Sequence, residues 1–238
     1  MTQHDARDVV VPGAVAPGYL VIPTAPRAAI VVCHEIFGRS PEIERVCHRL
    51  ADAGYAALMP DLFGSRSKPV CIARGLAQIA SGRGEFVDVI VAAADVVAAE
   101  SGVDRDRVGV IGFCMGGGFA LATGKAFKAT STNYGELPAV DVLRGIGPTI
   151  GCYGTRDRKY RDNGRELSKR LTVLGVPHEI HDDFDAGHAF LADGHHPVMA
   201  GLTRFLLDVD SVRDANVREE AWQRILAFFA RELAADQR

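Results

Sequence analysis

The sequence of 238 residues lacks the features that mark several classes of protein. No apolar run approaches the roughly 20 residues that a membrane-spanning helix needs, because Asp88 and Asp95 interrupt the longest candidate, residues 86–99. The net charge is only −3 and both signs are scattered along the chain, which argues against a nucleic-acid partner. The first residues are polar and hold no signal-peptide core, so we expect a cytoplasmic protein.

Cysteine is sparse, and no Cys-x-x-Cys pair occurs. The chain has five cysteines, at positions 33, 47, 71, 114 and 152. An odd number without that spacing predicts neither a zinc site nor a thioredoxin-like motif, and free thiols suit a reducing compartment. We expect the other four to be small packing or surface residues. Packing alone does not explain the glycines that flank Cys114.

Cys114 lies in a Gly-x-Cys-x-Gly turn between an apolar run, residues 108–113, and a helix-like stretch around residues 119–122. This pattern is typical of the nucleophile elbow, a strained turn between strand and helix, here with a thiol where serine is usual. The strain brings positions 112 and 116 so close that both must be glycine. The turn also places the sulfur at a helix N-terminus, where the dipole favours a thiolate.

Apolar runs and amphipathic stretches alternate along the chain. Strands are expected at residues 8–11, 18–22, 28–33, 55–59, 108–113, 130–134, 148–153 and 177–184, and helices at 41–53, 84–100, 163–174 and 217–234. Residues 60–82 are expected to form a loop with one short helix over the site. With no repeat and no linker, the pattern predicts one α/β domain, residues 1–238, with a mostly parallel central sheet and helices on both faces.

Two residues after Cys114 follow expected strands directly. Asp157 ends the segment Gly154-Thr155-Arg156-Asp157 after one strand, and His188 follows the last strand. A nucleophilic cysteine needs a base within hydrogen-bond reach and an acid that orients this base. Reacting groups gather at the carboxyl ends of parallel strands, so we expect Cys114, His188 and Asp157 to meet there.

Acyl transfer also needs two N–H donors that bind the developing oxyanion. The backbone N–H of Met115, directly after the nucleophile, is the first candidate. The second is the N–H of Ile36, in the loop of residues 34–38 that follows the strand 28–33. Both donors belong to the backbone, so their side chains are not part of the prediction.

Five segments resemble the dienelactone hydrolase family of the α/β-hydrolase superfamily. In the order of the family they are His34-Glu35-Ile36-Phe37-Gly38, Pro60-Asp61-Leu62, Gly112-Phe113-Cys114-Met115-Gly116-Gly117, Gly154-Thr155-Arg156-Asp157 and Ala186-Gly187-His188-Ala189-Phe190. The combination of a Glu-containing loop with a cysteine elbow is specific. The resemblance implies a Cys114–His188–Asp157 triad and a Glu35 that contacts the idle thiol until substrate displaces it. A carboxylate there disfavours a second negative charge, which keeps the thiol neutral.

The chain departs from this family in the groups that bind substrate. Family members that act on dienelactone hold its carboxylate with two arginines, and the position of one of them is Ala192 here. The other follows the Pro-Asp-Leu segment, where Arg66 is the loosely matching candidate for substrate binding. One missing charge-assisted partner costs about 1.5–3 kcal/mol of binding. The resemblance therefore implies ester or lactone hydrolysis without specifying dienelactone.

Other readings of these residues stay open. Asp182, Asp183 and Asp185 compete with Asp157 for the role of the acid, although they adjoin His188 in sequence. His195 and His196 suggest a metal, but no acidic or cysteine residue stands at ligand spacing. The C-terminal helix with Trp222 is expected to pack into the core, and a dimer face is the alternative.

The sequence thus predicts an enzyme that hydrolyses a small-molecule ester or lactone, similar to a carboxymethylenebutenolidase, through an acyl-enzyme on Cys114. No cofactor, metal, nucleic acid or membrane partner is implied, and the protein is expected to be a monomer or a homodimer. One alternative keeps the fold and changes the substrate to a thioester or another acyl compound. Another is a non-catalytic ligand binder or thiol sensor.

Overall fold

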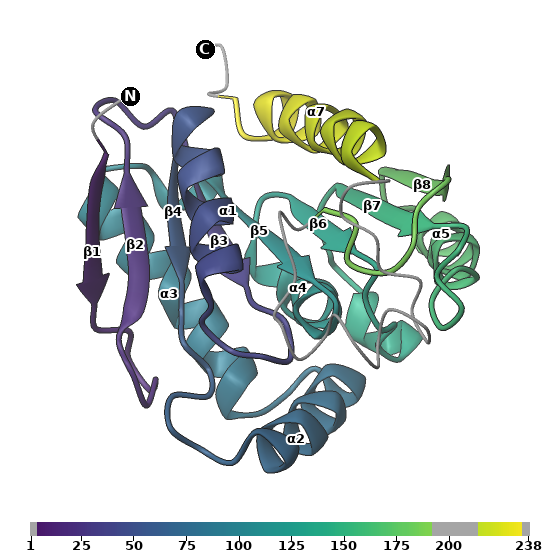
Figure 1. Ribbon diagram of the computed structural model, residues 1–238, viewed down its shortest axis with the longest axis horizontal. Coiled ribbons are helices and arrows are strands. Elements are labelled where there is room, and N and C mark those ends of the chain that lie inside the picture. Colours follow the sequence, from purple (N-terminus) through teal and green to yellow (C-terminus); the bar gives the residue numbers. More distant parts are fainter. Residues whose placement is uncertain (1–3, 192–213, 235–238) are drawn as a thin grey trace.

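A central sheet with helices on both faces forms the body of the molecule (Figure 1). The structure, a computed structural model, describes residues 4–191 and 214–234. The sheet has eight strands in the order β1-β2-β4-β3-β5-β6-β7-β8. Their bounds are β1 Asp5–Val9, β2 Gly18–Ile22, β3 Ala28–Cys33, β4 Tyr55–Met59, β5 Val108–Phe113, β6 Thr130–Asn133, β7 Thr149–Gly154 and β8 His178–Phe184.

The pairing within the sheet is mostly parallel. The hairpin β1–β2 is antiparallel, and β2 also pairs with β4 in the antiparallel sense. All other neighbours, from β4 through β3 and β5 to β8, pair in parallel. The carboxyl ends of these parallel strands therefore meet at one edge, which confirms the predicted α/β fold class.

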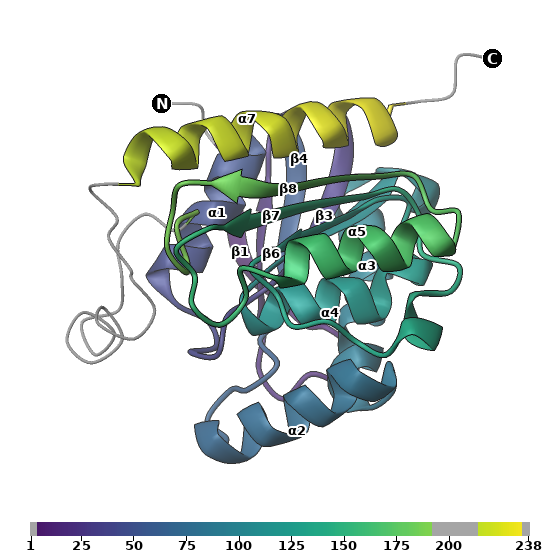
Figure 2. The same ribbon diagram turned by 90° about the vertical axis from the view of Figure 1, so that its right-hand side faces the viewer.

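Helices cover both faces of the sheet (Figure 2). Their bounds are α1 Pro41–Asp52, α2 Lys68–Ser81, α3 Glu85–Ser101, α4 Met115–Thr123, α5 Asn163–Val173 and α7 Ala215–Glu232. One apolar cluster joins the sheet to α1 and α7, and a second joins its other face to α2, α3 and α4. Helix α5 packs over β7 and β8 in a third cluster.

The strand β3 shows why its sequence is apolar without interruption. Ile30 and Val32 belong to the cluster under α1 and α7, whereas Val31 and Cys33 belong to the cluster under α3 and α4. Successive side chains point to opposite faces of a sheet, so a strand covered on both faces has no polar position. Each fully buried aliphatic side chain of this kind contributes about 1.5–3 kcal/mol.

Two elements differ from the expectation. The strand β1 begins at Asp5 rather than at residue 8, because Asp5 pairs with Ile22 at the edge of the sheet and charged side chains hide this pairing in the sequence. Residues 60–82 do contain one helix, but α2 has 14 residues and is longer than the short helix expected there. Its buried positions include Gly75 and Gln78, so its apolar periodicity is weak.

Candidate active site

The backbone of Cys114 has the unusual conformation of an elbow. Its φ is 54° and its ψ is −120°, a region that residues other than glycine rarely adopt. Cys114 follows β5 directly and precedes α4, so the half-buried thiol lies at the N-terminus of that helix. Its N–H donates to the carbonyl of Asn133 at 3.0 Å, and its carbonyl accepts from Gly117 N–H at 2.9 Å. The strained conformation is thus held on both sides by backbone hydrogen bonds.

The two glycines of the turn are there because backbone approaches them. A Cβ atom at Gly112 would lie 1.9 Å from the carbonyl oxygen of Gly116. A Cβ atom at Gly116 would lie 2.1 Å from the carbonyl oxygen of Cys33, on the neighbouring strand. Neither obstacle is a flexible side chain, so no rotation relieves the clash. The glycine spacing of the motif is therefore a requirement of the fold.

Polar side chains of β6 support the elbow from the adjacent strand. The amide of Asn133 donates to the carbonyl of Gly112 at 3.0 Å, and the Thr132 hydroxyl donates to that of Gly117 at 3.0 Å. Both residues are fully buried. The sequence analysis did not single them out. Their signal was a run of Thr, Ser and Asn inside a strand that should otherwise be apolar.

His188 and Asp157 meet directly at the carboxyl edge of the sheet. The distance between His188 Nδ1 and Asp157 Oδ2 is 2.7 Å, and the two residues are 3 % and 0 % exposed. The second oxygen, Oδ1, accepts the N–H groups of Lys159 and Tyr160 at 3.0 and 3.1 Å. With its lone pairs engaged, the carboxylate has little freedom to turn away from the imidazole.

The alternative acids lie elsewhere. Asp182 and Asp183 belong to β8, and Asp183 is exposed. Asp185, directly after the strand, is exposed as well and forms an ion pair with Arg156. Within the described part of the chain, Asp157 is thus the carboxylate that the structure brings to His188.

The surroundings of His188 favour its protonated form. Burial lowers its pKa, but the charge of Cys114 and hydrogen bonds to Asp157 and Cys114 outweigh burial and raise the pKa to about 10. A protonated imidazole at this place stabilises negative charge on its neighbours. The ring of Tyr160 stacks on the imidazole at 5.3 Å, and that of Tyr134 meets it edge-on at 5.0 Å. Neither tyrosine was singled out from the sequence, because no local pattern links them to His188.

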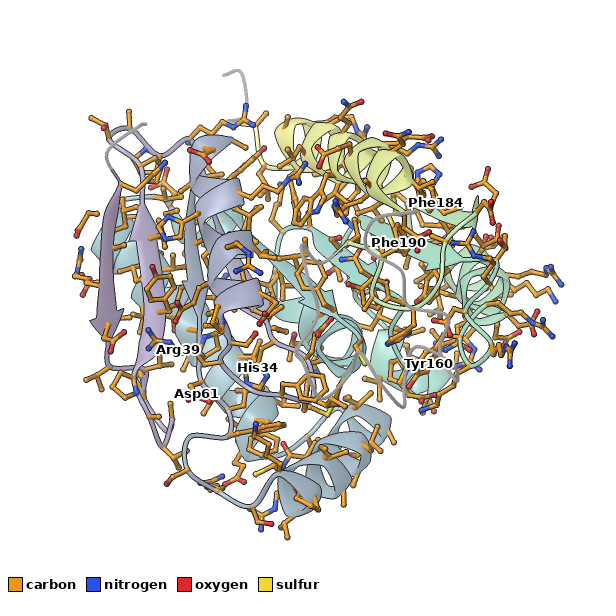
Figure 3. All side chains as sticks on the ribbon, viewed as in Figure 1. His34, Arg39, Asp61, Tyr160, Phe184 and Phe190 are labelled. Atoms are coloured by element: carbon orange, nitrogen blue, oxygen red, sulfur yellow. The ribbon has the colours of Figure 1, made fainter. Side chains whose placement is uncertain are left out.

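A buried histidine shapes the loop that carries Glu35 and Ile36. Leu62 N–H donates to His34 Nε2 at 3.1 Å, so this nitrogen is an acceptor and Nδ1 donates to the carbonyl of Glu35 at 2.7 Å. Burial lowers the pKa of His34, which agrees with a neutral ring. Figure 3 labels His34 in the loop after β3 and Asp61 in the loop after β4. In that view Tyr160 lies on the other side of α4.

The predicted oxyanion donors lie at the same edge of the sheet. Cys33 of β3 pairs with Gly112 of β5, and Ile36 and Met115 each follow their strand position by three residues. Met115 is the first residue of α4, so its N–H is one of those without a partner inside the helix. The register thus places Ile36 and Met115 at the sheet edge where the elbow stands.

Glu35 carries a buried oxygen that lacks a partner. Its Oε1 is buried and accepts no hydrogen bond from the described residues. Burial raises the pKa of this carboxyl, while His188 acts in the opposite direction. Glu35 also adds to the negative charge that, together with burial, raises the pKa of Tyr134, as Cys114 does. Glu35, Tyr134 and His188 therefore share one electrostatic neighbourhood with the thiol.

Arg66 forms an ion pair outside this group of residues. Its Nη1 lies 2.9 Å from Glu85 Oε1, at the start of α3, and Arg74 of α2 lies 2.6 Å from the same oxygen. The position of Ala192 lies outside the described residues, as do those of His195 and His196. Residues 4–191 and 214–234 contain no group of three or more His, Cys, Asp or Glu side chains arranged to hold a metal ion, and no helix among them is apolar and long enough to cross a bilayer.

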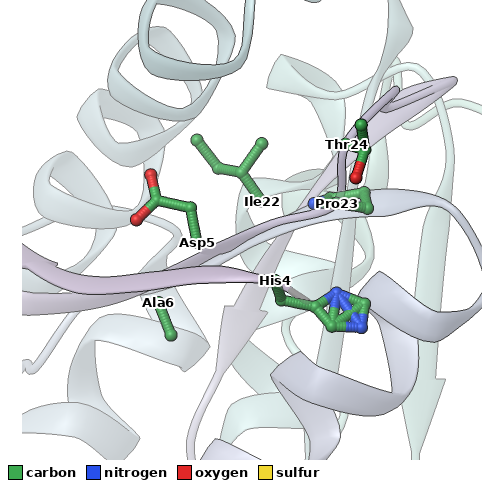
Figure 4. A pocket seen from close by; sticks show the side chains of 6 residues that line it. All are labelled: His4, Asp5, Ala6, Ile22, Pro23 and Thr24. Carbon is green, nitrogen blue, oxygen red and sulfur yellow. The ribbon is translucent and has the colours of Figure 1, made fainter. Parts of the chain in front are cut away.

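One open hollow lies beside the hairpin β1–β2 (Figure 4). It has a volume of about 540 Å³ and is lined by His4, Asp5, Ala6, Ile22, Pro23 and Thr24. These residues flank the hairpin β1–β2, and β4 and β3 separate that hairpin from β5. The hollow offers no nucleophile, and His4 is paired with Asp52 at 2.9 Å. Size alone therefore does not make it a reaction site.

Comparisons with known proteins point to one family. A family model described as "Dienelactone hydrolase family" matches residues 16–233. A protein of Salmonella typhimurium named "Putative carboxymethylenebutenolidase" is 30% identical over 240 residues, which cover 90% of this chain and 82% of that protein. The carboxymethylenebutenolidase of Rhodococcus opacus is 28% identical over 225 residues, covering 86% of this chain and 81% of its own.

A solved structure shares the fold. It is a dienelactone hydrolase-like promiscuous phosphotriesterase from metagenomic libraries, with a TM-score of 0.78 and 22% sequence identity. The match covers 96% of this chain and 98% of the other. At this identity the likeness concerns the arrangement of strands and helices.

Proposed function

Because the chain belongs to the dienelactone hydrolase family, we propose that it hydrolyses a small ester or lactone with Cys114 as the nucleophile. The observation that carries this proposal is the 2.7 Å contact between His188 and Asp157, at the sheet edge where the Cys114 elbow stands. A base oriented by a buried acid next to a strained thiol is the arrangement that nucleophilic catalysis needs.

The first half of the reaction forms an acyl-enzyme. The Cys114 thiolate attacks the carbonyl carbon, and the carbonyl π electrons move onto oxygen. The N–H groups of Ile36 and Met115 bind this oxyanion. When the tetrahedral intermediate collapses, the C–O bond to the leaving group breaks and His188 gives its proton to the departing alkoxide. The products are a thioester on Cys114 and an alcohol, or one open-chain acyl group if the substrate is a lactone.

The second half releases the acid. Neutral His188 takes a proton from water, and the oxygen of this water attacks the thioester carbonyl. The same two N–H groups bind the second oxyanion, and collapse breaks the C–S bond. Cys114 leaves as a thiolate beside the imidazolium, so the starting pair is regenerated. Asp157 holds the imidazole by Nδ1, which leaves Nε2 to exchange the proton throughout.

Glu35 fits the role of a group that restrains the idle thiol. Its buried, unpartnered oxygen lies in the charge neighbourhood of His188 and Tyr134. A carboxylate at this place opposes a thiolate, and a substrate that moves or neutralises it releases the opposition. The restraint protects the thiol from oxidation between turnovers.

The charges around the site favour substrates without a carboxylate. Arg66, the arginine available from the sequence to bind an anion, is paired with Glu85 and shares it with Arg74. The acidic groups Glu35 and Asp157 lie close to His188 instead. We therefore propose a neutral ester or lactone as the preferred substrate, because among the described residues an anionic one meets like charge without a dedicated partner.

The test is the turnover of p-nitrophenyl acetate and of a panel of neutral lactones. Changing Cys114→Ala is expected to abolish turnover while circular dichroism and the melting temperature stay close to those of the wild type. Cys47→Ala, which removes a buried thiol of α1, is the matched control and is expected to keep activity. Undiminished turnover by the Cys114→Ala protein would contradict the proposal. So would a wild type that forms no acyl adduct with any ester, which would favour a ligand binder.

A further inference from the structure

The loops that carry Asp157 and His188 are joined by an arginine that precedes the acid in sequence. The Arg156 guanidinium donates through Nη1 to the carbonyl of Asp185 at 2.6 Å and forms ion pairs with the carboxylates of Asp185 and Asp214. Asp185 stands at the start of the His188 loop, and its carboxylate is largely exposed. The Arg156 side chain thus connects the loop of Asp157 to the loop of His188 and to the start of α7.

Asp214 completes the connection. This residue directly precedes α7 and is 1 % exposed, so its carboxylate has left water almost completely. Its Oδ1 pairs with Arg156 Nη2, and its Oδ2 accepts the N–H of Gly187 at 3.2 Å. Gly187 is the residue before His188. The two oxygens of one buried carboxylate therefore contact the neighbours of both Asp157 and His188.

The backbone hydrogen bonds between these loops stop short of the histidine. Thr155 N–H donates to the carbonyl of Phe184 at 2.8 Å, and Arg156 N–H donates to that of Ala186 at 3.0 Å. These bonds fix the first part of the His188 loop against the strand end. Among the described contacts between the two loops and α7, the carboxylate of Asp214 is the one that holds Gly187.

We propose that Asp214 and Arg156 are positioning residues that set His188 against Asp157 by holding the backbone on either side of that contact. The inference rests on the proposed function, since it assigns a role toward the triad. A buried carboxylate and a half-buried guanidinium are costly to separate, because removal of Arg156 leaves Asp214 charged and buried without this partner. The pair therefore resists small movements of the two loops, and the 2.7 Å contact between His188 and Asp157 depends on such precision.

The contacts of Asp214 connect the helix α7 to the candidate site. In Figure 2 the N-terminal end of α7 lies on the side to which the strands β7 and β8 point. The helix packs through Trp222 and Phe229 into the cluster that also contains Phe113 of β5. Asp214, at its first turn, is thereby fixed to the sheet that also carries the elbow.

The experiment compares Asp214→Asn with the wild type in kcat, KM and the rate at which iodoacetamide alkylates Cys114 across pH. Asparagine keeps the shape and an acceptor for Gly187 but loses the charge that holds Arg156. We expect kcat to fall about 10- to 100-fold, the size seen when partners that orient a functional histidine are removed, with KM nearly unchanged. Alkylation at neutral pH is expected to slow, because a displaced imidazolium stabilises the thiolate less.

The matched control is Glu219→Gln on the same helix. It removes an ion pair with Arg49 that is 2.6 Å long and lies away from both loops. This variant is expected to lower stability slightly and to leave kcat and the alkylation profile unchanged. If Asp214→Asn does not fold, Arg156→Lys decides instead, since lysine keeps the charge but cannot bridge two carboxylates with a fork.

A folded Asp214→Asn protein, or a folded Arg156→Lys protein in its place, with the kcat and alkylation profile of the wild type would overturn the inference. That result would leave the proposed function intact, because Cys114→Ala would still be inactive. The proposed function fails separately if Cys114→Ala keeps its activity, whatever the Asp214 variant does.

Discussion

The charge of a single sulfur atom depends on residues that act in opposite directions. The charge of Cys114 and a hydrogen bond to Asp157 raise the pKa of His188 to about 10 against the effect of burial, so the surroundings favour the imidazolium. Burial raises the pKa of the Glu35 carboxyl, and this carboxyl opposes a thiolate when it is ionised. In the proposed reaction, the balance of these groups decides how much of Cys114 is ready to attack a carbonyl.

Glu35→Gln tests this balance. The amide keeps the size of the side chain and removes its charge, so the thiolate loses a neighbour that opposes it. We expect iodoacetamide to alkylate Cys114 about 3- to 10-fold faster at neutral pH, the effect of removing one nearby like charge. Glu44→Gln, which breaks an ion pair between α1 and Arg39, is the control and is expected to change nothing. An alkylation rate equal to that of the wild type would show that Glu35 does not restrain the thiol.

The sequence predicted some of these residues and missed others for a physical reason. Cys114 stood out because its backbone conformation requires glycine at fixed spacing, and Asp157 and His188 stood out because they follow strands. Their catalytic roles stay predictions. Tyr160 and Asp214 left no local pattern, since their contacts with the triad loops depend on how distant segments pack.

Among the elements, the turn from β5 to α4 has the least room for an added side chain. It is built where three segments of backbone touch: the turn itself, the end of β3 and the end of β6. The hydrogen bonds from Asn133 and Thr132 tie it to β6 as well. The element therefore survives only if no side chain enters these contacts.

Gly116→Ala is expected to destroy this element. Its Cβ atom would lie 2.1 Å from the carbonyl oxygen of Cys33, and both sides of the clash are backbone. We expect the free energy of unfolding to fall by at least about 3 kcal/mol and activity to be lost. The comparison is Gly102→Ala, where an added Cβ meets nothing within 4 Å and only the positive φ is strained, at a cost of about 1 kcal/mol. Urea denaturation measures both, and similar losses for the two variants would contradict the account of the elbow.

Other elements show which strands and helices apolar periodicity predicts and which it misses. The strands β3, β4 and β5 match their expected residues because apolar side chains are needed on both faces. The helix α2 was underestimated because part of its contact with α3 is polar. Gln78 Oε1 accepts the N–H of Phe86 at 2.8 Å, which ties α2 to α3 by a polar bond that hydropathy does not register.

For the whole molecule, the sheet brings together residues that are distant in the chain. Alternation of strands and helices predicted the α/β class, but not that β3 lies between β4 and β5. That order depends on which faces pack together, and the sequence states only that they are apolar. The expectation of one domain over residues 1–238 stays a prediction.

The raised pKa of His188 makes the stability of the molecule depend on pH. The folded value of about 10 exceeds the ordinary value of 6.5, so the stabilisation is fully present below pH 6.5 and is lost as pH rises through about 10. Between these values the folded state holds one proton more than the unfolded state, and the free energy of unfolding falls by about 1.4 kcal/mol per pH unit from this group. His188→Gln lacks this contribution. Urea denaturation of both proteins from pH 7 to 10 is expected to show their stabilities converging, and a constant difference would contradict the assignment.

The most direct test of the central claim is mass spectrometry of the wild type, quenched with acid during turnover of p-nitrophenyl acetate. The account predicts an acetyl group on the peptide that contains Cys114, present during turnover, gone after the ester is consumed, and absent from Cys114→Ala. Consumption of the ester with no acyl group on Cys114, or with the group on another residue, would contradict it.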